Sequence, residues 1–518
     1  AVVDGFLTGK PLVVKPDKTA DDHSLAELGT MMMGFAQDAL YTKNPAAEEK
    51  FLLLWRYALD QGFARGSAMG NNHHYGYETR SIFAASYLMR DVLARAGVLQ
   101  QVADALGFWS GLPESRSSLA TGRDGVVDSW NTLLLGRLMA ALMIPAETES
   151  SRAVRALIDW TSSSLLPTPG NMGGLKPDGA VFHHAGHYPA YAIGGFEGLT
   201  SFLMAVRNSG LSIEEPAKAS LAKALTAMKQ YTHTYDWTIG LSGRHPHAGA
   251  MTAEVLERAQ LLGLITDTNP QGFFVMNHAA LGVYRTGSAL VTLKGYNSDV
   301  WGSEIYTADN RYGRYQSHGA VEILNAGDPV SRAASRFAEN GWDWNKLPGT
   351  TAVQLPLSLL ESPQTSTLMA RSPERFAGAS SLLGQFGVFG MKLHEQNDIN
   401  NTNYTSDFKA RKSVFATGKR LICLGTGIQT ARAHYPVETT LFQQVILSPS
   451  DRVSLNGSFT SAEGFLHDAV ASGVVVVSDM TGNQYRVAGG NRLVVEGKLQ
   501  HSRHNKTKAE NSGNFLSA

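Results

Sequence analysis

The stretch GFFVMNHAALGVYR, residues 272–285, decides the fold class because the hydrophobic period of the chain changes beside it. Before it, from about Ser24 to Ile265, apolar residues recur at the spacing of helices. From it onward, apolar and β-branched runs alternate with turns of Gly, Asn and Asp. The sequence therefore predicts an α-helical array followed by a large antiparallel β domain, with the change near residue 268.

Segments on the two sides of this change have different expected structures. The expected helices are 24–41, 46–63, 81–97, 131–143, 151–166, 191–210, 216–231 and 252–265. The expected further strands are 289–296, 420–429, 439–447, 473–480 and 491–497. Several helices are apolar on more than one face, which is typical of stacked helical hairpins. The loops between them are long and rich in Gly, Asn, His and Trp, so we expect a functional site there.

The composition is that of a globular protein of 518 residues, with 43% apolar and 17% charged residues. Equal numbers of basic and acidic residues, 45 of each, argue against a general nucleic-acid-binding protein, which carries a basic excess. A local basic cleft for a polyanion is compatible with this balance. The single cysteine, Cys423, excludes a disulfide within the chain and a Cys-rich zinc site.

The chain carries no run of about 18 apolar residues, so no membrane span is predicted. Its first residues, AVVDGFLTGKPLVVKPD, lack the charged region and apolar run of a signal peptide. We expect either that a signal has been removed or that the chain is part of a longer protein.

The stretch FHHAGHYPAYAIGGF (182–196) concentrates titratable rings, and a metal site, an acid/base site and an inert polar loop all compete to explain it. Its histidines are His183, His184 and His187. Gly186 and Pro189 break any helix that could present them at the spacing of a zinc site. The acid/base interpretation rests on His184 and Tyr191, which flank a turn that opens a helix.

Two further segments combine aromatic rings with arginines. LSGRHPHAGA (241–250) lies between helices and carries Arg244, whose fixed charge suits an oxyanion or a carboxylate. NSDVWGSEIYTADNRYGRYQSHG (297–319) interleaves tyrosines with charged residues, which suits an anionic sugar chain because rings stack on sugar faces and arginines pair with sulfate or carboxylate. Its charged members include Glu304, Arg311 and Arg314. A surface arginine and a solvated strand edge are the alternatives.

Two short segments carry weaker signals. NNHHYGYETR (71–80) is predicted to be the loop before a helix and contains a histidine pair whose second member is His74. DSWNTL (128–133) places Trp130 and Asn131 before a helix, where Asn is more often a cap than a ligand.

Taken in order along the chain, the motifs resemble those of polysaccharide lyase family 8, and within it most closely the chondroitin sulfate ABC lyases. The motifs are HHAGHYPAY (183–191), SGRHPH (242–247), DVWGSEIYTADNRYGRYQSHG (299–319) and NGWDWNKLPGTT (340–351). The resemblance covers nearly all of the chain. It implies an α+β multidomain protein, with an incomplete α/α toroid over 1–268 and an antiparallel β-sandwich domain, itself expected to be truncated, over 269–518.

The resemblance also implies cleavage of uronate-containing polysaccharides by β-elimination, with His184, Tyr191, Arg244 and Glu304 as the catalytic residues. The C5 hydrogen of a uronate is α to a carboxylate, so its removal requires stabilisation of the charge that builds on that group. Neutral His184, with Asn131, is expected to bind the carboxylate. Tyr191, held as a phenolate by Arg244, is expected to take the proton and then protonate the leaving oxygen, while Glu304 orients Arg244.

Further residues are assigned to substrate binding by the same comparison. They are Asn131, His74, His183, Trp130, Arg311 and Arg314. Iduronate presents its C5 proton on the opposite face, so dermatan cleavage needs a second base, for which His183 and His74 are the candidates.

No cofactor is expected to be required; some relatives are stimulated by Ca²⁺, and no metal ligands are assigned. The expected partner is a glycosaminoglycan, with no nucleic acid and no membrane, and the expected protein is a secreted or periplasmic monomer. The alternatives are a glycan-binding protein without activity and a glycoside hydrolase, which would need a carboxylate pair. Asp124 and Asp128 are the nearest candidates for that pair, although turn and cap roles suit them better.

Overall fold

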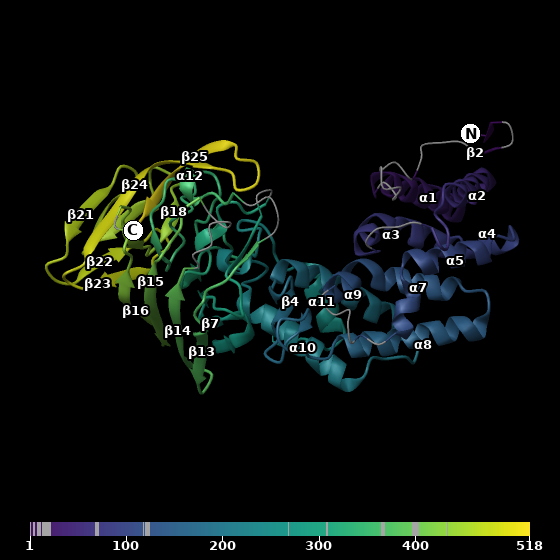
Figure 1. Cartoon of the computed structure of the whole chain (residues 1–518), viewed down its shortest axis with the longest axis horizontal. Coiled ribbons are helices and arrows are strands. Elements are labelled where there is room, and N and C mark those ends of the chain that lie inside the picture. The colour runs from purple at the N-terminus through teal and green to yellow at the C-terminus, as the bar shows by residue number, and fades with distance from the viewer. Residues whose placement is uncertain are drawn as a thin grey trace.

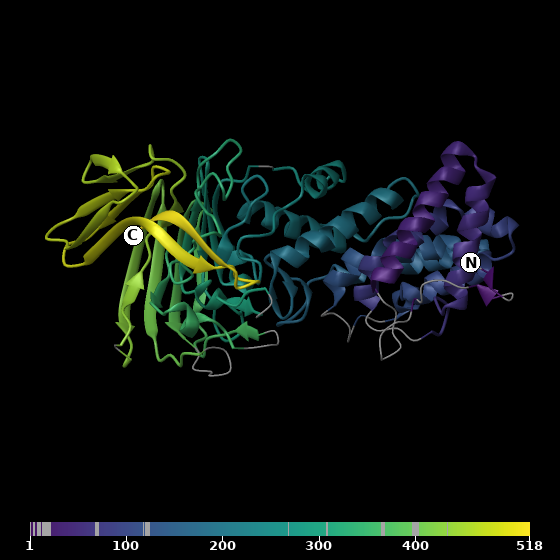
Figure 2. The same ribbon diagram turned by 90° about the horizontal axis from the view of Figure 1, so that it is seen from above.

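The protein consists of a helical half and a β half placed end to end, as the two views of the chain show (Figures 1 and 2). This computed structural model describes residues 2–3, 6–7, 12, 22–67, 72–117, 119, 125–267, 269–306, 309–363, 368–395, 403–432 and 434–518. The α+β architecture predicted from the change of hydrophobic period is confirmed. The predicted division at 268/269 lies between Leu261, where the last helix of the helical half ends, and Gly272, where the first long sheet begins. The domain boundary itself stays a prediction.

The helical half is an open array of helices. It contains α1 (Asp22–Thr42), α2 (Pro45–Asp60), α3 (Asn72–Leu88), α4 (Arg90–Arg95), α5 (Leu99–Trp109), α6 (Val126–Asp128), α7 (Leu134–Met143), α8 (Glu147–Ser164), α9 (Pro189–Val206), α10 (Glu215–Tyr231) and α11 (Ala253–Leu261). Short turns are η1 (Leu112–Arg116), η3 (Ile239–Leu241) and the π-helical η2 (Ser129–Leu133). In both views α1 and α2 lie at the far end from α10 and α11, so the array does not close into a ring (Figures 1 and 2). None of the helices in the described ranges is long and apolar enough to cross a membrane.

The prediction that residues 71–80 form a loop is wrong, because α3 begins at Asn72. The segment is rich in residues of low helix propensity, so its sequence pattern does not reveal the helix. Tertiary packing supplies the stabilisation instead: α3 lies so close to η2 that a Cβ on Gly76 would be 2.7 Å from the Cβ of Thr132. Helix α5 was likewise not predicted.

The β half is built from antiparallel sheets. The first sheet contains β10 (Ala320–Leu324), β8 (Ala289–Lys294), β7 (Leu281–Thr286) and β6 (Gly272–Met276) in that order. The second contains β13 (Ala377–Leu382), β14 (Phe386–His394), β15 (Lys409–Thr417) and β16 (Arg420–Gln429). The stretch 272–285 is therefore two strands and not one, because the 3₁₀ turn η4 (Asn277–Ala279) separates β6 from β7.

Two more sheets lie at the end of the molecule remote from the helices (Figure 1). One contains β18 (Gln443–Val445), β25 (Glu510–Ser517), β24 (Arg492–Arg503) and β21 (Leu466–Val470). The other contains β20 (Ser458–Ser461), β19 (Arg452–Leu455), β22 (Val475–Ser478) and β23 (Gln484–Val487). Smaller pairings join β1 (Val2–Val3) to β2 (Phe6–Leu7), β9 (Ser303–Ile305) to β12 (Leu368–Ala370), β11 (Thr351–Val353) to β17 (Val437–Thr439), and β3 (Gly174–Leu175) to β4 (Val181–His183) and β5 (Gly186–His187). The remaining short helices are η5 (Gly313–Tyr315) and α12 (Leu357–Leu360).

The two halves share one apolar core and a polar seam. Val283 and Leu290 of the first sheet belong to the same buried cluster as Phe196 and Leu225 of the helices. Beside it, the guanidinium of Arg285 donates to the carbonyl oxygens at the end of α10, at 2.5 Å for Thr232 and 3.4 Å for Lys229 and Gln230. A cation at a helix C-terminus is favourable because the carbonyls there have no partner within the helix. The first sheet is therefore fixed to the helical half.

A glycine seam on α9 brings η2 close to this helix. A Cβ on Gly198 would lie 1.8 Å from the carbonyl oxygen of Trp130, and one on Gly194 would lie 2.5 Å from Nδ2 of Asn131. Only glycine allows backbones to approach so closely. The seam thus sets the position of Asn131.

We predict that Gly198→Ala lowers the free energy of unfolding by about 1–3 kcal/mol, because the added methyl group overpacks the contact with η2. Gly34→Ala is the matched control: it also lies within a helix, nothing lies within 4 Å of a Cβ there, and it should be neutral or slightly stabilising. Denaturant unfolding of both variants measures the difference. Equal stability of the two variants would contradict the close approach.

Candidate active site

The segment 182–191 forms a tight hairpin followed by the start of a helix. His184 and Ala185 are its two turn residues, with φ of 50° and 57°. Positive φ at both positions is the type I′ geometry, which strains residues other than Gly, Asn or Asp by about 1–3 kcal/mol. Trp301 holds the turn, because its Nε1 donates to the carbonyl of His184 at 3.0 Å. Gly186 makes room for this indole, since a Cβ there would lie 1.9 Å from Trp301 Nε1.

Tyr191 and Arg244 are in direct contact. Pro189 occupies the first turn of α9 with its fixed φ and places Tyr191 on the face toward the 241–250 loop. The guanidinium of Arg244 donates to the Tyr191 hydroxyl at 2.8 Å, and the Arg244 backbone N–H donates to the Tyr188 hydroxyl at 3.2 Å. Gly243 has φ of 63°, and a Cβ there would lie 2.1 Å from the Tyr188 ring, so glycine is required for the loop to approach.

Glu304, on β9, completes the group from the β half. Its carboxylate accepts a hydrogen bond from His184 Nδ1 at 2.8 Å and one from the Tyr188 hydroxyl at 2.6 Å. Arg244 lies 3.7 Å away. Burial alone would raise the pKa of Glu304, but these hydrogen bonds and charges lower it below its usual value, so the carboxylate is ionised. His184, Tyr191, Arg244 and Glu304 therefore meet as one cluster, here called the four-residue cluster.

Tyr188 is a member of this site that sequence reasoning missed. It belongs to the quoted ring-rich stretch, but nothing in the pattern distinguishes it from Tyr191. Burial, followed by the charge of Glu304, raises the pKa of Tyr188 far above its usual value, so its phenol stays a donor. Burial also raises the pKa of Tyr191 to about 12, although the Arg244 charge opposes the shift. Tyr191 is therefore a phenol in the unliganded protein and not the phenolate expected from the sequence.

Asp128 also faces the site, although the sequence suggested a turn or cap role. It ends α6 without capping the helix that follows, and its Oδ2 lies 3.6 Å from His183 Nε2. The His183 ring is 4.0 Å from the Tyr191 ring and 4.2 Å from the His184 ring. Burial raises the pKa of Asp128, while the charges of His184, His74 and Arg244 lower it. No sequence signal links this residue to the site, because its partners lie some 55 residues away.

Asn131 lies on η2 at the edge of the four-residue cluster and not at a helix cap. Its side-chain oxygen accepts from Arg80 at 2.8 Å, and its amide nitrogen donates to the Tyr77 hydroxyl at 3.3 Å. π-Helical turns are rare and occur often at functional sites. His74, on the same helix as Tyr77 and Arg80, is exposed. These residues form a polar rim beside Asp128.

Three residues predicted to bind substrate have partners inside the protein: Trp130, Arg311 and, as described below, Arg314. Trp130 is 0% exposed and its indole donates to the Ser164 hydroxyl at 2.9 Å. Arg311 pairs with Glu361 at 2.8 Å. These placements argue against direct contact with a ligand, because the polar groups already have partners inside the protein.

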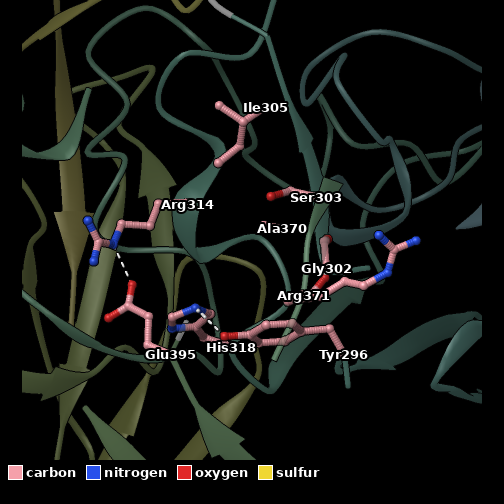
Figure 3. A pocket seen from close by; sticks show the side chains of 10 residues that line it. Tyr296, Gly302, Ser303, Ile305, Arg314, His318, Ala370, Arg371 and Glu395 are labelled. Atoms are coloured by element: carbon pink, nitrogen blue, oxygen red, sulfur yellow. Dashed lines mark hydrogen bonds and ion pairs between the residues drawn. The ribbon is translucent and has the colours of Figure 1, made fainter. Parts of the chain in front are cut away.

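Arg314 lies behind β9 and not in front of it. It is paired with Glu395 on the wall of a cavity of about 40 Å³ that Ser303 and Ile305 also line (Figure 3). Successive side chains of a strand point to opposite faces, so Glu304 points away from this cavity. The cavity can hold about two or three waters. Arg314 thus supports β9 from behind. The interpretation of 297–319 as an anionic-sugar surface is not supported for Arg311 and Arg314, because both are paired with carboxylates of the protein.

The three histidines considered as metal ligands do not share one site, because the His183 and His184 rings lie 4.2 Å apart whereas His187 is turned away from them. His187 points into the core beside Tyr231, and burial lowers its pKa to about 4. His247, which was not one of these candidates, packs at 5.2 Å from Trp342 and 5.7 Å from Trp344, so the SGRHPH and NGWDWNKLPGTT motifs are in contact. Among the described residues no group of three or more His, Cys, Asp or Glu is placed to hold a metal ion.

Comparison with known proteins gives two matching family models. One, described as "Lyase, catalytic", matches residues 11–271, and the other, "Polysaccharide lyase family 8, super-sandwich domain", matches residues 271–513. The chain is 31% identical to a chondroitin sulfate ABC endolyase of Proteus vulgaris, over 95% of this chain and 51% of the relative. It is 30% identical to a chondroitin sulfate ABC exolyase of Bacteroides thetaiotaomicron, over 77% of this chain and 45% of the relative. The chain thus spans about half the length of the curated relatives it matches.

Solved structures support the fold. A Paenibacillus xanthan lyase superposes with a TM-score of 0.74 at 16% identity, over 98% of this chain and 53% of that chain. The Streptomyces coelicolor A3 chondroitin AC lyase, solved with chondroitin sulphate, superposes with a TM-score of 0.67 at 14% identity, over 98% of this chain and 78% of that chain. At these identities the likeness shows the shared architecture of a helical domain and an antiparallel β domain.

Glu304→Gln should lower kcat by about 100-fold, because a neutral amide cannot hold both His184 and Arg244. Steady-state kinetics with chondroitin sulfate, the polymer after which the curated relatives are named, measure the loss, and circular dichroism checks the fold. Glu149→Gln, which breaks an exposed ion pair with Arg116, should leave kcat within about twofold. Equal kcat in the two variants would show that Glu304 does not contribute to the activity of the site.

Proposed function

We propose that this chain, which belongs to polysaccharide lyase family 8, is a glycosaminoglycan lyase that cleaves uronate-containing chains by β-elimination. The observation that carries the proposal is the convergence of the four-residue cluster from three distant segments, with Arg244 bonded to Tyr191 and Glu304 bonded to His184. The names of the relatives, chondroitin sulfate ABC lyases, support chondroitin sulfate as a substrate. Dermatan sulfate and hyaluronan are the further candidates.

We assign the binding of the uronate carboxylate to His184. Its side chain is 31% exposed, and Nδ1 is committed to Glu304, which leaves Nε2 for the ligand. Since Nδ1 donates to an ionised carboxylate, Nε2 can also donate only when the ring carries both protons. A hydrogen bond from Nε2 would stabilise the negative charge that builds on the substrate carboxylate. Asn131 lies at the edge of the same space.

We assign the proton transfer to Tyr191. In the proposed step its phenolate oxygen takes the C5 hydrogen, the C5 electron pair forms the C4–C5 double bond, and the bond from C4 to the glycosidic oxygen breaks. The leaving oxygen then takes the proton from Tyr191, which restores the phenolate. Arg244 stabilises that phenolate through its 2.8 Å contact. The free protein contains little of it, because the pKa of Tyr191 is about 12.

This scheme assigns every charge that develops to a protein group, so we propose that no cofactor is required and that Ca²⁺ acts, where it acts, as a stimulator. A polymeric substrate found outside cells suits a secreted or periplasmic monomer. A glycoside hydrolase is disfavoured, because Glu304 is 0% exposed and both its oxygens are bonded. Of the two carboxylates considered for a hydrolase, Asp128 faces His183 at 3.6 Å and Asp124 lies outside the described residues.

Tyr191→Phe should reduce kcat by about 10²–10⁴-fold, because it removes the proton-transfer group. Ultraviolet absorbance during incubation with chondroitin sulfate, dermatan sulfate and hyaluronan is the measurement, since elimination creates an absorbing double bond conjugated to the carboxylate and hydrolysis does not. Tyr231→Phe, a buried tyrosine in the core, is the matched control and should keep wild-type kcat. Reducing ends released without absorbance would indicate a hydrolase, and binding without cleavage would indicate a glycan-binding protein.

We further propose His74 as the second base for iduronate. His183, the other candidate, is 4% exposed and is enclosed by Asp128 and Tyr191, whereas His74 is exposed on α3 and interacts electrostatically with the same Asp128. A base that acts on the opposite face of the sugar has to be accessible to the sugar.

His74→Ala should therefore lower the rate on dermatan sulfate at least about tenfold more than the rate on chondroitin sulfate. His73→Ala, the adjacent histidine, is the control and should leave the ratio of the two rates unchanged. Parallel absorbance assays on the two polymers give this ratio. An equal loss on both polymers in His74→Ala, or a wild-type protein that does not cleave dermatan sulfate, would refute the assignment.

A further inference from the structure

The hairpin between β24 and β25 reaches back from the end of the chain toward the helical half (Figures 1 and 2). Residues 504–509 form its tip, closed by the pairing of Arg503 with Glu510. The tip contacts the loop that follows β9: Arg311 donates to the carbonyls of Asn505 and Lys506, both at 3.2 Å. The far sheet therefore touches the segment that carries Glu304.

Asn505 makes the innermost contact of this tip. It is 2% exposed. Its side-chain oxygen accepts from the Tyr312 backbone N–H at 2.8 Å, and its amide nitrogen donates to the side-chain oxygen of Asn310 at 2.7 Å. The first bond anchors the tip, and the second determines which way the Asn310 amide faces, because its oxygen must point at Asn505.

Asn310 in turn joins the backbones of two residues of the four-residue cluster. Its amide nitrogen donates to the Glu304 carbonyl at 2.9 Å and to the carbonyl of Gly243, immediately before Arg244, at 3.2 Å. The same nitrogen lies 2.6 Å from Oε1 of Gln316, so its two N–H groups are shared among three acceptors. Asn310 is 0% exposed, so water cannot replace these bonds. A Cβ on Gly313 would lie 2.2 Å from this amide, which therefore has no space in which to shift.

We propose that Asn505 is a positioning residue of the active site: through Asn310 it sets the distance between Arg244 and Glu304. A rotated Asn310 amide would present its oxygen to two carbonyl oxygens, and the 241–250 loop would move away from β9. A charged link runs parallel to this path, because Asp309 lies 2.9 Å from Lys506 Nζ and 3.6 Å from Arg244 Nε. Lys506 is 61% exposed, so this second link is weak. Asn505 and Asn310 do not touch the substrate. The kinetic part of the test rests on the lyase reaction proposed above.

Asn505→Ala should lower kcat on chondroitin sulfate by about 10- to 100-fold with little change in KM, because a displacement of about 1 Å at catalytic groups has this effect. In an Asn310→Ala background the same substitution should lower kcat no further, because its effect passes through Asn310. Lys508→Ala, on the same tip but paired with Glu361, is the matched control and should keep wild-type kcat. If Asn505→Ala does not fold, Asn505→Ser, which is too short to bond both partners, replaces it.

Hydrogen exchange measured by mass spectrometry tests the positioning role of Asn505 without an activity assay. In Asn505→Ala, peptides covering 239–250 and 303–306 should exchange faster, while strands β24 and β25 stay protected. If the wild-type protein has no lyase activity but Asn505→Ala still shows this exchange response, the lyase proposal is refuted and the positioning role stands. If the wild-type protein is active, three results would each overturn the positioning role. Asn505→Ala could keep kcat within about twofold of wild type, or it could exchange like wild type. Its loss of kcat could also add to that of Asn310→Ala.

Discussion

The buried charge of Glu304 is the constraint on which the site depends. A carboxylate that is 0% exposed costs several kcal/mol to desolvate unless it is hydrogen-bonded and faced by opposite charge. His184 and Tyr188 supply the hydrogen bonds, and Arg244 supplies the charge. All three partners come from the helical half, whereas Glu304 belongs to the β half. The carboxylate is therefore satisfied only when both halves are in place, and the site exists only in the assembled protein.

The β half holds the loop that carries Arg244 as well as Glu304. Glu322 of β10 accepts the backbone N–H groups of Ile239 and Gly240 at 2.9 and 2.7 Å, at the start of the segment that leads to Arg244. Gln316 adds a bond to the Ile239 carbonyl at 3.2 Å. Because these contacts are buried, each unmade bond would leave a polar group without a partner. The loop is therefore fixed by the sheet it packs on, and its own sequence contributes mainly the glycines that allow the approach.

The sequence predicted the type of architecture well because hydrophobic period is a local property, and it predicted the cluster because the motifs around His184, Arg244 and Glu304 are long. It failed where a decision depends on distant partners. A tryptophan that stacks on sugar and one that fills a core have the same local signature, so Trp130 was misplaced. Arg314 in a buried ion pair likewise resembles an arginine that awaits a sulfate. Asp128 was taken for a turn residue because only the fold brings it to His183.

The role of Arg244 shows why this position requires an arginine. The ionised Glu304 is needed to hold His184, yet its charge, like that of Asp128, raises the pKa of Tyr191 and opposes the phenolate. Arg244 offsets both effects through its contacts: it donates to Tyr191 at 2.8 Å, faces Glu304 at 3.7 Å and places Nε 3.6 Å from Asp309. A lysine ammonium is a single point of charge and cannot face three groups on different sides, whereas a planar guanidinium offers nitrogen atoms in a fixed fork. The same fork lets the cluster keep a carboxylate and a potential phenolate in one buried space, because the positive charge is shared between them before substrate arrives.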